Sequence, residues 1–371
     1  MPRPLRVLPT RDAIEVRDAL ASALEGDGPA LLPVDPSAAA LPGAPADVND
    51  DVALVVATSG STGAPKLVAL GAAALRASSA AAHAALGGPG QWLLALPSHY
   101  IAGLNVLARS LDAAIDPIAL PEGPFDPVAF GDAAVRLEHP RRYTSLVPVQ
   151  LARLLDEPAV HDALRRFDAI LVGGQATPSE LLDRSRRLGL TVVRTYGSSE
   201  TAGGCVYDGS PLDDVRVRIV DGEVWLSGPT LANGYLSGAD TDSAFVTEAG
   251  VRWYRTGDLG TVTDGILSIV GRIDDQIVSG GTNVSLGAVE SVVRRMPRLA
   301  DAVVVAAPSE RWGSVPVLVT TADVELALVR TAVKEALGPA AAPARIVRVE
   351  RIPLLPSGKP DRQALTRLAA Q

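Results

Sequence analysis

The sequence has little cysteine and little histidine. Cys205 is the only cysteine, and four histidines are scattered over 371 residues. A single cysteine excludes an intrachain disulfide framework, and this small set of side chains cannot build a typical zinc site. The chain also lacks an apolar run of about 18 residues, the length that suggests a membrane span, and residues 1–6 lack the apolar core of a signal peptide. We therefore expect a cytoplasmic protein.

Lysine is scarce as well. Among the 34 basic residues, only Lys66, Lys334 and Lys359 are lysine. Lys66 and Lys359 lie in motifs rich in Gly, Ser and Pro. A site that needs a compact, flexible ammonium group would not accept the larger, planar guanidinium of arginine. Chance is the alternative, and we expect Lys334 on the solvated face of an amphipathic helix. The net charge of −8 argues against a nucleic-acid groove as the main function.

One polar stretch dominates what is present. An apolar run at 52–57 predicts a buried strand, and it leads into Thr58-Ser59-Gly60-Ser61-Thr62-Gly63-Ala64-Pro65-Lys66. Glycines allow close approach of the backbone to a ligand, backbone N–H groups can form an anion nest, and hydroxyls and Lys66 add donors. This chemistry suits a polyphosphate, although Pro65 rules out a Walker A loop. A polar hairpin loop without function is the alternative.

Predicted strands alternate with predicted helices through the first half of the chain. Strands are expected at 52–57, 67–70, 92–96, 143–147, 169–172 and 191–195, and helices at 11–24, 71–86, 103–111, 148–155 and 178–188. The alternation predicts a largely parallel sheet with helices on both faces. Thr10 is a candidate cap for the first helix. From residue 215 to 226 the pattern changes to antiparallel sheet, with turns at 228–229 and 234–235.

A second change of pattern follows residue 271. A helix capped by Ser285, strands, and a last helix capped by Asp361 predict a small α+β domain. We therefore expect an α/β protein of two domains. Residues 1–273 form a large domain of layered mixed and parallel sheets with helices, and residues 274–371 form the small domain.

Ligands of parallel sheets bind beyond the carboxyl ends of the strands. The candidate binding residues lie directly after predicted strands, at these ends. They are Gly173, Gly174 and Gln175 after one strand, and Tyr196, Gly197, Ser198, Ser199, Glu200 and Thr201 after the next. Glu200 is a hard oxygen ligand suited to Mg²⁺ beside phosphates; a capping or surface glutamate is the alternative. His99 ends another strand as a substrate contact or a core histidine.

Asp258 and Lys359 stand out further along. Asp258 is flanked by glycines, and a carboxylate in such a turn can accept both hydroxyls of a ribose; an ordinary Asx turn is the alternative. The hairpin that follows is expected to turn at Asp264-Gly265. The segment Pro356-Ser357-Gly358-Lys359 presents the last lysine on a turn.

The order of these motifs resembles the adenylate-forming superfamily of acyl-CoA synthetases, luciferases and adenylation domains. The matching motifs are Thr-Ser-Gly-Ser-Thr-Gly-x-Pro-Lys, Tyr-Gly-x-x-Glu-Thr, Tyr-x-Thr-Gly-Asp, Gly-Arg-x-Asp-Asp, Ser-Gly-Gly and Pro-x-x-x-Ser-Gly-Lys, from Thr58 to Lys359. The resemblance implies an α/β fold with a mobile C-terminal lid. It also implies two half-reactions: a carboxylate attacks ATP to give an acyl-adenylate, and a thiol then attacks the activated carbonyl.

The resemblance implies a role for each matching position. Ser59 to Lys66 grip the β- and γ-phosphates, Glu200 binds Mg²⁺, and Thr201 contacts phosphate. Gly173, Gly174 and Tyr196 bracket the adenine, and Asp258 and Arg272 hold the ribose. Lys359 bridges carboxylate and α-phosphate, Asp274 is the hinge, and Ser279, Gly280 and Gly281 help to form the thiol channel. The implied cofactors are ATP, Mg²⁺ and CoA.

Within the superfamily, the chain most resembles the short actinobacterial o-succinylbenzoate–CoA ligases of menaquinone biosynthesis. Residues 1–57 precede the phosphate loop, fewer than is usual in the family, so we expect a reduced N-terminal subdomain, which would affect the outer wall of the pocket and any homodimer contacts. Arg109 is a candidate for the second carboxylate of the substrate, with a structural arginine as the alternative; Ser198 and Ser199 could line the acyl pocket. Other readings are a different aryl- or acyl-CoA ligase, an enzyme that loads a carrier-protein thiol, and a non-catalytic nucleotide-binding protein.

Overall fold

The computed structural model describes residues 2–37, 43–58, 65–236, 241–355 and 360–370. The chain forms two compact units. The first contains residues 1–177, 181–218 and 225–255, and the second contains residues 178–180, 219–224 and 256–371. The boundary expected between residues 273 and 274 stays a prediction.

One sheet of the first unit flanks the expected phosphate loop. Its described strands are β1 (Arg3–Pro9), β2 (Ala30–Val34), β3 (Asp47–Val48), β4 (Val52–Thr58), β5 (Lys66–Gly71) and β15 (Gly234–Tyr235). They lie in the order β15-β5-β4-β2-β1-β3. β1, β2 and β4 are parallel, whereas β5 returns antiparallel to β4. The strands expected at 52–57 and 67–70 are therefore confirmed, and β4 is buried from Val52 to Val56, as its apolar run predicts.

The turn expected at residues 234–235 is wrong. These two residues form β15, which pairs antiparallel with β5 opposite Ala69 and Val68. Two residues are too few to show the alternation of apolar and polar side chains that is typical of a strand. Their extended conformation results from pairing with the edge of β5, which the local sequence does not indicate.

The second sheet of this unit is mostly parallel, as predicted. Its described strands are β6 (Gln91–Leu94), β7 (Ile118–Ala119), β8 (Arg142–Leu146), β9 (Ala169–Val172), β10 (Val192–Ser198), β11 (Gly203–Tyr207) and β12 (Ser210–Pro211). They lie in the order β12-β11-β10-β9-β8-β6-β7, parallel from β7 to β10 and antiparallel from β10 to β12.

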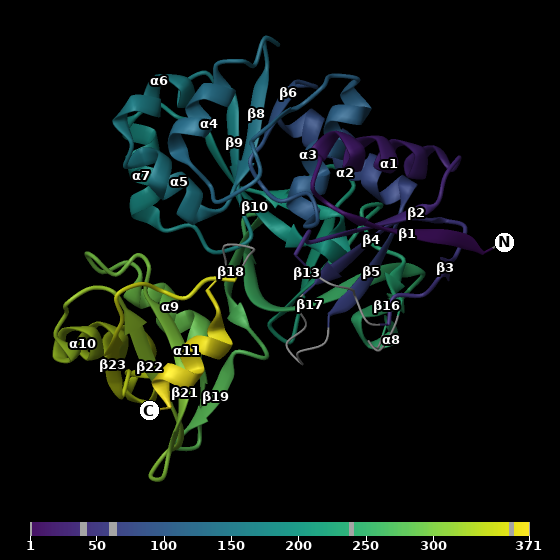
Figure 1. Ribbon diagram of the computed structural model, residues 1–371. Helices are drawn as coiled ribbons and strands as arrows, with labels where there is room; N and C mark the ends of the chain where they lie inside the picture. The colour runs from purple at the N-terminus through teal and green to yellow at the C-terminus, as the bar shows by residue number, and fades with distance from the viewer. Residues whose placement is uncertain (1, 38–42, 59–64, 237–240, 356–359, 371) are drawn as a thin grey trace. The chain divides into compact units, whose positions relative to one another are not determined.

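Helices cover both faces of the second sheet. The helices of this part of the chain are α1 (Ala13–Glu25), α2 (Ala72–Ala85), α3 (Ile101–Ala113), α4 (Pro127–Ala134), α5 (Pro148–Leu155), α6 (His161–Leu164) and α7 (Ser179–Arg187), with the short 3₁₀ helices η1 (Pro158–Val160) and η2 (Ser199–Thr201). The short helix α8 (Thr241–Ala244) instead contacts β16 (Phe245–Glu248). α1, α2 and α3 lie between the two sheets, and α4, α5 and α7 pack on the other face (Figure 1). None of the described helices is both long and apolar enough to cross a membrane.

The cap expected for the first helix is wrong. The side chain of Asp12, not that of Thr10, accepts the N–H of Ile14 at 2.8 Å and caps α1. Thr10 instead lies two residues earlier, where its hydroxyl is 3.2 Å from the carbonyl of Val34. Either residue type suits a cap, and the chain path decides between them.

A third sheet is antiparallel, as the pattern after residue 215 predicts. Its described strands are β13 (Arg216–Val220), β14 (Glu223–Ser227), β16 (Phe245–Glu248), β17 (Val251–Thr263) and β18 (Ile266–Arg272). The hairpin between β17 and β18 turns at Asp264 and Gly265, with φ of 51° and 80°. This is the left-handed geometry that the Asp-Gly pair predicts.

The C-terminal part of the second unit is the expected α+β arrangement. Its described elements are β19 (Gln276–Ser279), β20 (Thr282–Ser285), α9 (Leu286–Val293), β21 (Val303–Ser309), β22 (Gly313–Thr320), α10 (Leu326–Leu337), η3 (Pro339–Ala341), β23 (Arg345–Arg348) and α11 (Arg362–Ala369). α9 and α10 pack in one apolar cluster, and α11 packs in another. Ser285 and Asp361 cap α9 and α11, which confirms both predicted caps, and Lys334 is exposed on α10 as expected. The predicted fold class is confirmed.

Candidate active site

The phosphate loop leaves one strand and enters its antiparallel neighbour. Thr58 ends β4 and Lys66 begins β5, and the two residues pair across the strands. The Thr58 hydroxyl lies 3.4 Å from the carbonyl oxygen of Lys66. Ser59, Gly60, Ser61, Thr62 and Gly63 lie outside the described residues, so their phosphate contacts stay predictions. Both ends of the loop are thus held by a sheet whose neighbouring strands are buried.

Tyr235 connects the two charged residues expected at the phosphates. Its hydroxyl donates to Oε1 of Glu200 at 3.0 Å. The Nζ atom of Lys66 lies 5.1 Å from the centroid of its ring. Burial, and then the nearby charge of Glu200, raises the pKa of Tyr235, so the hydroxyl keeps its proton at neutral pH and acts as a donor. Lys66 and Glu200, far apart in sequence, therefore both lie next to one side chain.

The backbone of the turn that carries Glu200 is held by hydrogen bonds from two helices. Glu200 and Thr201 lie in η2, and Ala202 follows with a φ of 50°. Side chains of two helices, Ser78 and Asn105, each donate to the carbonyl of Ala202 at 2.9 Å. A left-handed alanine is unfavourable by itself, and these two bonds stabilise it. Because Glu200 precedes this anchored residue, its backbone has little freedom.

Thr201 is fully buried beside Glu200. Its hydroxyl accepts the N–H of Ser198 at 2.9 Å and lies 2.8 Å from the carbonyl of Gly203. These bonds fix the turn, and the phosphate contact expected of Thr201 stays a prediction. Ser199 is buried as well, and the buried hydroxyl of Ser198 has no hydrogen-bond partner in the described part of the chain.

The glycines after β9 and within β10 allow close backbone approach. A Cβ on Gly173 would lie 2.3 Å from the Thr195 hydroxyl, and one on Gly197 would lie 2.1 Å from the carbonyl of Gly203. Gly174 has a φ of 78°, which favours glycine. The structure thus places the Gly173-Gly174-Gln175 segment beside the β10 segment that carries Tyr196, as parallel neighbours. Their contacts with adenine stay predictions.

Arg109 is buried within α3, with 3% of its surface exposed. Its guanidinium lies 4.9 Å from the ring centroid of Trp92, and Nη2 lies 3.3 Å from the hydroxyl oxygen of Tyr207. Its Nε–H has no acceptor, and no carboxylate forms an ion pair with it, among the described residues. A buried cation is unfavourable without an anion, and the contact with a substrate carboxylate expected of Arg109 stays a prediction.

His99 ends the segment after β6 and is largely buried. Its Nδ1 lies 3.3 Å from the Thr10 hydroxyl, and its Nε2 lies 3.9 Å from a carboxylate oxygen of Asp35. Burial lowers the pKa of His99, and Asp35 opposes this only in part. The ring is therefore neutral at pH 7, and the substrate role expected for His99 stays a prediction.

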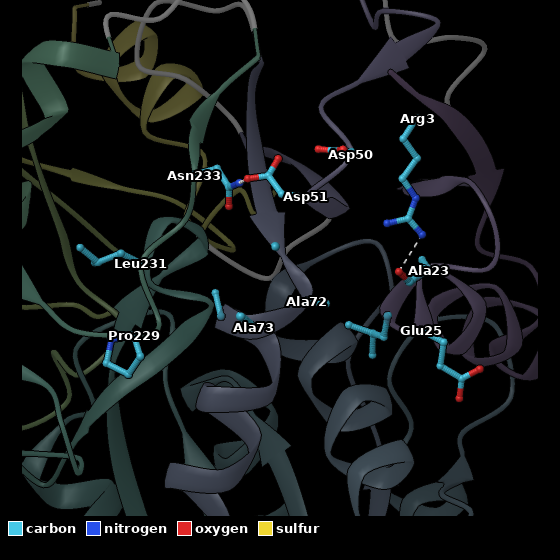
Figure 2. A pocket seen from close by; sticks show the side chains of 14 residues that line it. Arg3, Ala23, Glu25, Asp50, Asp51, Ala72, Ala73, Pro229, Leu231 and Asn233 are labelled. Atoms are coloured by element: carbon cyan, nitrogen blue, oxygen red, sulfur yellow. Dashed lines mark hydrogen bonds between the residues drawn. The ribbon is translucent and has the colours of Figure 1, made fainter. Parts of the chain in front are cut away.

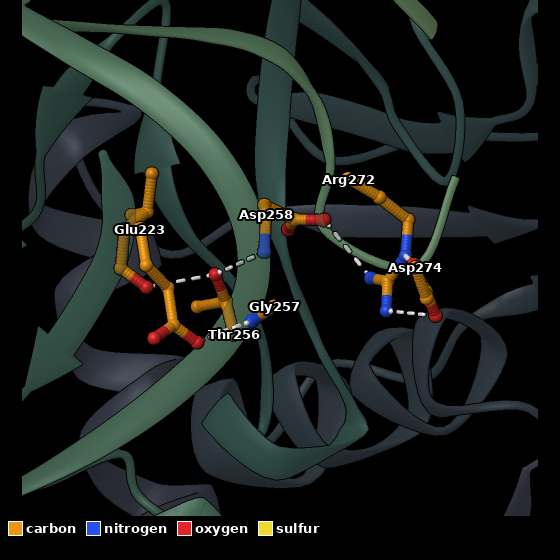
Figure 3. A network of polar contacts seen from close by, with 7 residues as sticks. Glu223, Thr256, Gly257, Asp258, Arg272 and Asp274 are labelled. Atoms are coloured by element: carbon orange, nitrogen blue, oxygen red, sulfur yellow. Dashed lines mark hydrogen bonds and ion pairs between the residues drawn. The ribbon is translucent and has the colours of Figure 1, made fainter. Parts of the chain in front are cut away.

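The residues expected at the ribose form a polar network in the second unit. Figure 3 shows Arg272 between two carboxylates: Nη1 donates to Asp258 at 2.9 Å, and Nε and Nη2 donate to Asp274 at 2.7 and 3.0 Å. The expected turn around Asp258 is wrong, because Asp258 lies within β17 opposite Arg272. The Thr256 hydroxyl accepts the N–H of Asp258 at 2.9 Å, which steadies its backbone.

This network joins the predicted ribose residues to the predicted hinge. Arg272 holds Asp274 through two parallel bonds, the strong bidentate geometry of guanidinium and carboxylate. The next residue, Asp275, is more buried, and burial raises its pKa although Arg362 partly offsets the effect. The roles of Asp258, Arg272 and Asp274 stay predictions.

The predicted thiol-channel loop is the turn between β19 and β20. Gly280 and Gly281 have φ of 58° and 82°, and Ser279 is buried. A Cβ on Gly280 would lie 2.6 Å from the ring of Trp312, so only glycine fits. Lys359 lies outside the described residues. Its neighbours are anchored, since Leu354 bridges Pro360 and the N–H of Asp361 donates to the carbonyl of Pro353 at 2.9 Å.

A pocket of about 370 Å³ in the first unit contains none of the predicted site residues (Figure 2). Arg3, at its wall, donates to the carbonyls of Ala23, Gly28 and Val52. Asn233 donates to Asp51 at 2.6 Å. These polar groups are engaged with the protein, and the pocket brings none of the expected site residues together.

Sequence reasoning missed Tyr235, Ser78 and Asn105, which position the residues it found. Tyr235 was placed in a turn, and the two helical residues belong to helices whose pattern shows only core packing. No local signal connects any of them to Glu200, since the contacts join distant segments. Cys205, beyond the Glu200 turn, is buried, and burial raises the pKa of its thiol to about 12.

The donor set fits magnesium held chiefly by phosphate. No group of three or more His, Cys, Asp or Glu residues that could hold a metal occurs among the described residues. Mg²⁺ typically takes one or two carboxylates and completes its shell with water and substrate phosphates. Glu200, a single hydrogen-bonded carboxylate, matches that arrangement.

Comparisons with known proteins agree with the motif order. The family described as AMP-binding enzyme matches residues 9–236, and the family described as AMP-binding enzyme C-terminal domain matches residues 288–359. A probable 2-succinylbenzoate–CoA ligase of Mycobacterium tuberculosis is 43% identical over 362 residues, 94% of each chain. A 2-succinylbenzoate–CoA ligase of Escherichia coli is 32% identical over 320 residues, 83% of this chain and 67% of that one.

Solved structures agree as well. Escherichia coli MenE with bound OSB-AMS has a TM-score of 0.79 at 26% identity, covering 99% of this chain and 87% of that one. The o-succinylbenzoate CoA synthetase (MenE) of Bacillus subtilis, in complex with the acyl-adenylate intermediate OSB-AMP, has a TM-score of 0.73 at 28% identity, covering 97% and 82%. The resemblance to adenylate-forming enzymes is thereby confirmed, and this chain belongs to the AMP-binding enzyme family.

Proposed function

We propose that this chain is an ATP-dependent acid–CoA ligase that converts 2-succinylbenzoate to 2-succinylbenzoyl-CoA in menaquinone biosynthesis. The observation that carries the proposal is the 43% identity to a probable 2-succinylbenzoate–CoA ligase over 94% of both chains. The arrangement of Lys66, Tyr235 and Glu200 supports the nucleotide half of the reaction.

In the first half-reaction, a carboxylate oxygen of the acid attacks the α-phosphorus of ATP and pyrophosphate leaves. Lys66 and the loop before it hold the β- and γ-phosphates. Asp258 accepts hydrogen bonds from the ribose, and Arg272 orients Asp258 through the bond already present between them. Lys359 supplies positive charge to the carboxylate and α-phosphate oxygens as negative charge develops there.

Glu200 would hold Mg²⁺, which when bound offsets negative charge on the phosphates. Glu200 is 8% exposed and already oriented by Tyr235, so it offers a carboxylate of fixed direction. In the second half-reaction, the sulfur of CoA attacks the acyl carbonyl and AMP leaves with the electron pair of the broken bond. The turn at Ser279 to Gly281 would border the path of the thiol.

Arg109 supports an acid with two carboxylates. One carboxylate reacts, and the other needs a cation or hydrogen-bond donors. Arg109 is a buried cation with an unsatisfied Nε–H and no ion-paired carboxylate in the described part of the chain. A carboxylate supplied by the substrate would meet that need through a charge-assisted hydrogen bond.

Replacing Arg109 with methionine should reduce selectivity for 2-succinylbenzoate. Methionine keeps an unbranched chain and removes the charge, so kcat/KM should fall by about 10- to 100-fold for 2-succinylbenzoate, the value of one charged hydrogen bond. The value for benzoate should change much less. Steady-state kinetics with both acids measure this, and Tyr207→Phe tests the packing around the same guanidinium. Equal losses with both acids would show that Arg109 is only structural.

The decisive experiment is the mass of the product formed with ATP, Mg²⁺, CoA and a panel of acids. A CoA thioester formed much faster with 2-succinylbenzoate than with benzoate, fatty or cinnamic acids supports the proposal. Pyrophosphate release with another acid would retain the mechanism and reject the pathway, and transfer only to a carrier-protein thiol would reject CoA. Absence of pyrophosphate with every acid would favour a non-catalytic nucleotide-binding protein.

A further inference from the structure

We propose that Tyr235 is a positioning residue that aims the Glu200 carboxylate at the metal and keeps the Lys66 ammonium beside it. The inference rests on the proposed function, because it takes Glu200 as the Mg²⁺ ligand and Lys66 as a phosphate contact. Tyr235 touches no reacting atom in this arrangement and acts through the two charged residues.

The hydroxyl of Tyr235 controls the direction of the carboxylate. It donates to Oε1 of Glu200 at 3.0 Å, which uses one oxygen and sets the plane of the group. Ligating carboxylates are commonly oriented in this way by partners outside the metal shell, and losing such a partner typically weakens metal binding about 10- to 100-fold. The backbone carbonyl of Glu200 also accepts the N–H of Ala232 at 2.8 Å, three residues before Tyr235. The same chain segment therefore holds both the backbone and the side chain of Glu200.

The ring of Tyr235 controls the position of Lys66. The Nζ atom lies 5.1 Å from the ring centroid, within the range of a cation–π interaction. Lysine is long and flexible, so contact with an aromatic ring narrows the positions that its ammonium occupies. A cation and an anion are thus kept near each other without a direct ion pair between them, which leaves both available to a phosphate and a metal.

Tyr235 is rigid enough for this role. It pairs with Val68 across the sheet, two residues from Lys66 on the same strand. Its N–H donates to the Thr241 hydroxyl at 3.0 Å, and its ring meets that of Phe245 edge-on at 5.9 Å. Backbone pairing and ring packing therefore fix the side chain before any ligand arrives.

Tyr235→Phe tests the hydroxyl while it keeps the ring. Mn²⁺ binding to the full chain in the presence of α,β-methylene-ATP, followed by electron paramagnetic resonance, reports the metal site without turnover. We expect Mn²⁺ binding to weaken about 10-fold or more. Tyr143→Phe is the matched control, since it removes a tyrosine hydroxyl bonded to the carbonyls of Leu86 and Gly88. The control should retain the wild-type affinity, and unchanged affinity in Tyr235→Phe would overturn the proposal.

Tyr235→Leu removes the ring as well. With EDTA in place of metal, its affinity for α,β-methylene-ATP should fall about 2- to 5-fold below that of Tyr235→Phe, the value of one cation–π contact. Equal affinities of the two variants would overturn the role of the ring. Wild-type chain that binds Mn²⁺ and nucleotide but makes no thioester would contradict the proposed function and leave this inference standing. Wild-type chain that binds neither would overturn both.

Discussion

Lys359→Ala should slow acyl-adenylate formation about 10²- to 10³-fold, the loss expected when one electrostatic donor to a transition state is removed. The same variant should still convert supplied acyl-adenylate to the thioester at close to the wild-type rate. Single-turnover assays of the two steps, with ATP and acid or with acyl-adenylate and CoA, measure each separately.

The residues next to Lys359 support an effect restricted to one step. Leu354 bridges Pro360, and Asp361 caps α11, so the segment that carries the lysine begins and ends at anchored points. Alanine at position 359 should therefore remove a charge without disturbing the fold. The charge is needed where negative charge develops on the α-phosphate, and thiol attack develops its charge elsewhere.

Lys334→Ala is the matched control. Lys334 is the other lysine of the C-terminal part and is exposed on α10, so its loss should leave both steps unchanged. Equal losses in both steps for Lys359→Ala would contradict the assignment of this lysine to adenylation and the two-step use of the C-terminal domain.

Glu290→Ala should destabilise the C-terminal part of the chain by about 3 kcal/mol, the lower end of the range for removing one partner of a buried ion pair. Glu290 is 7% exposed and joins three elements. Glu290 lies on α9, and its carboxylate pairs at 2.8 Å with Arg294, the residue after α9, and at 2.8 Å with Arg362 on α11; it also accepts the N–H of Val304 of β21 at 3.0 Å.

The large effect follows from what alanine leaves behind. Arg294 would remain buried without its carboxylate, and the N–H of Val304 would lose its acceptor. Burial already lowers the pKa of Arg294, and Glu290 is the main group that opposes this. Since α11 starts three residues after Lys359, loosening it should also reduce adenylation.

Hydrogen exchange of the full chain measures this prediction locally, because amides in α9 and β21 report the free energy of their own opening. Asp323→Ala is the control in the same part of the chain. Its ion pair with Arg348 spans 3.7 Å between exposed side chains, so its loss should change stability by about 0.5 kcal/mol or less. Protection in Glu290→Ala equal to that of the control would show that the buried cluster does not stabilise this domain.

The sequence alone predicted the elements whose signals are local. The apolar run before Thr58, the Asp-Gly turn at 264–265 and the caps at Ser285 and Asp361 each depend on residues within a few positions of one another. The motif order from Thr58 to Lys359 likewise predicted the family, because the chemistry of each motif is carried by neighbouring residues.

Local sequence signals gave a wrong prediction in two situations. In one, two nearby residues were equally suitable for the same role; in the other, the residue that decided the conformation lay far away in the sequence. Thr10 and Asp12 are both suitable caps, and Asp12 caps α1 because the helix begins at Ala13. Asp258 has the flanking glycines of a turn, yet its pairing with Arg272 on β18 places it in a strand.

Composition and motif spacing thus determined the class of fold, the exclusion of an intrachain disulfide, and the acid-activating chemistry expected of this chain. Only the tertiary structure brought Tyr235 into contact with both Lys66 and Glu200, Ser78 and Asn105 to the carbonyl of Ala202 in the Glu200 turn, and Arg109 into a buried site. The physical reason is the same in each case. Hydrogen bonds and ring contacts between distant segments depend on sheet order and helix packing, which no short stretch of sequence encodes.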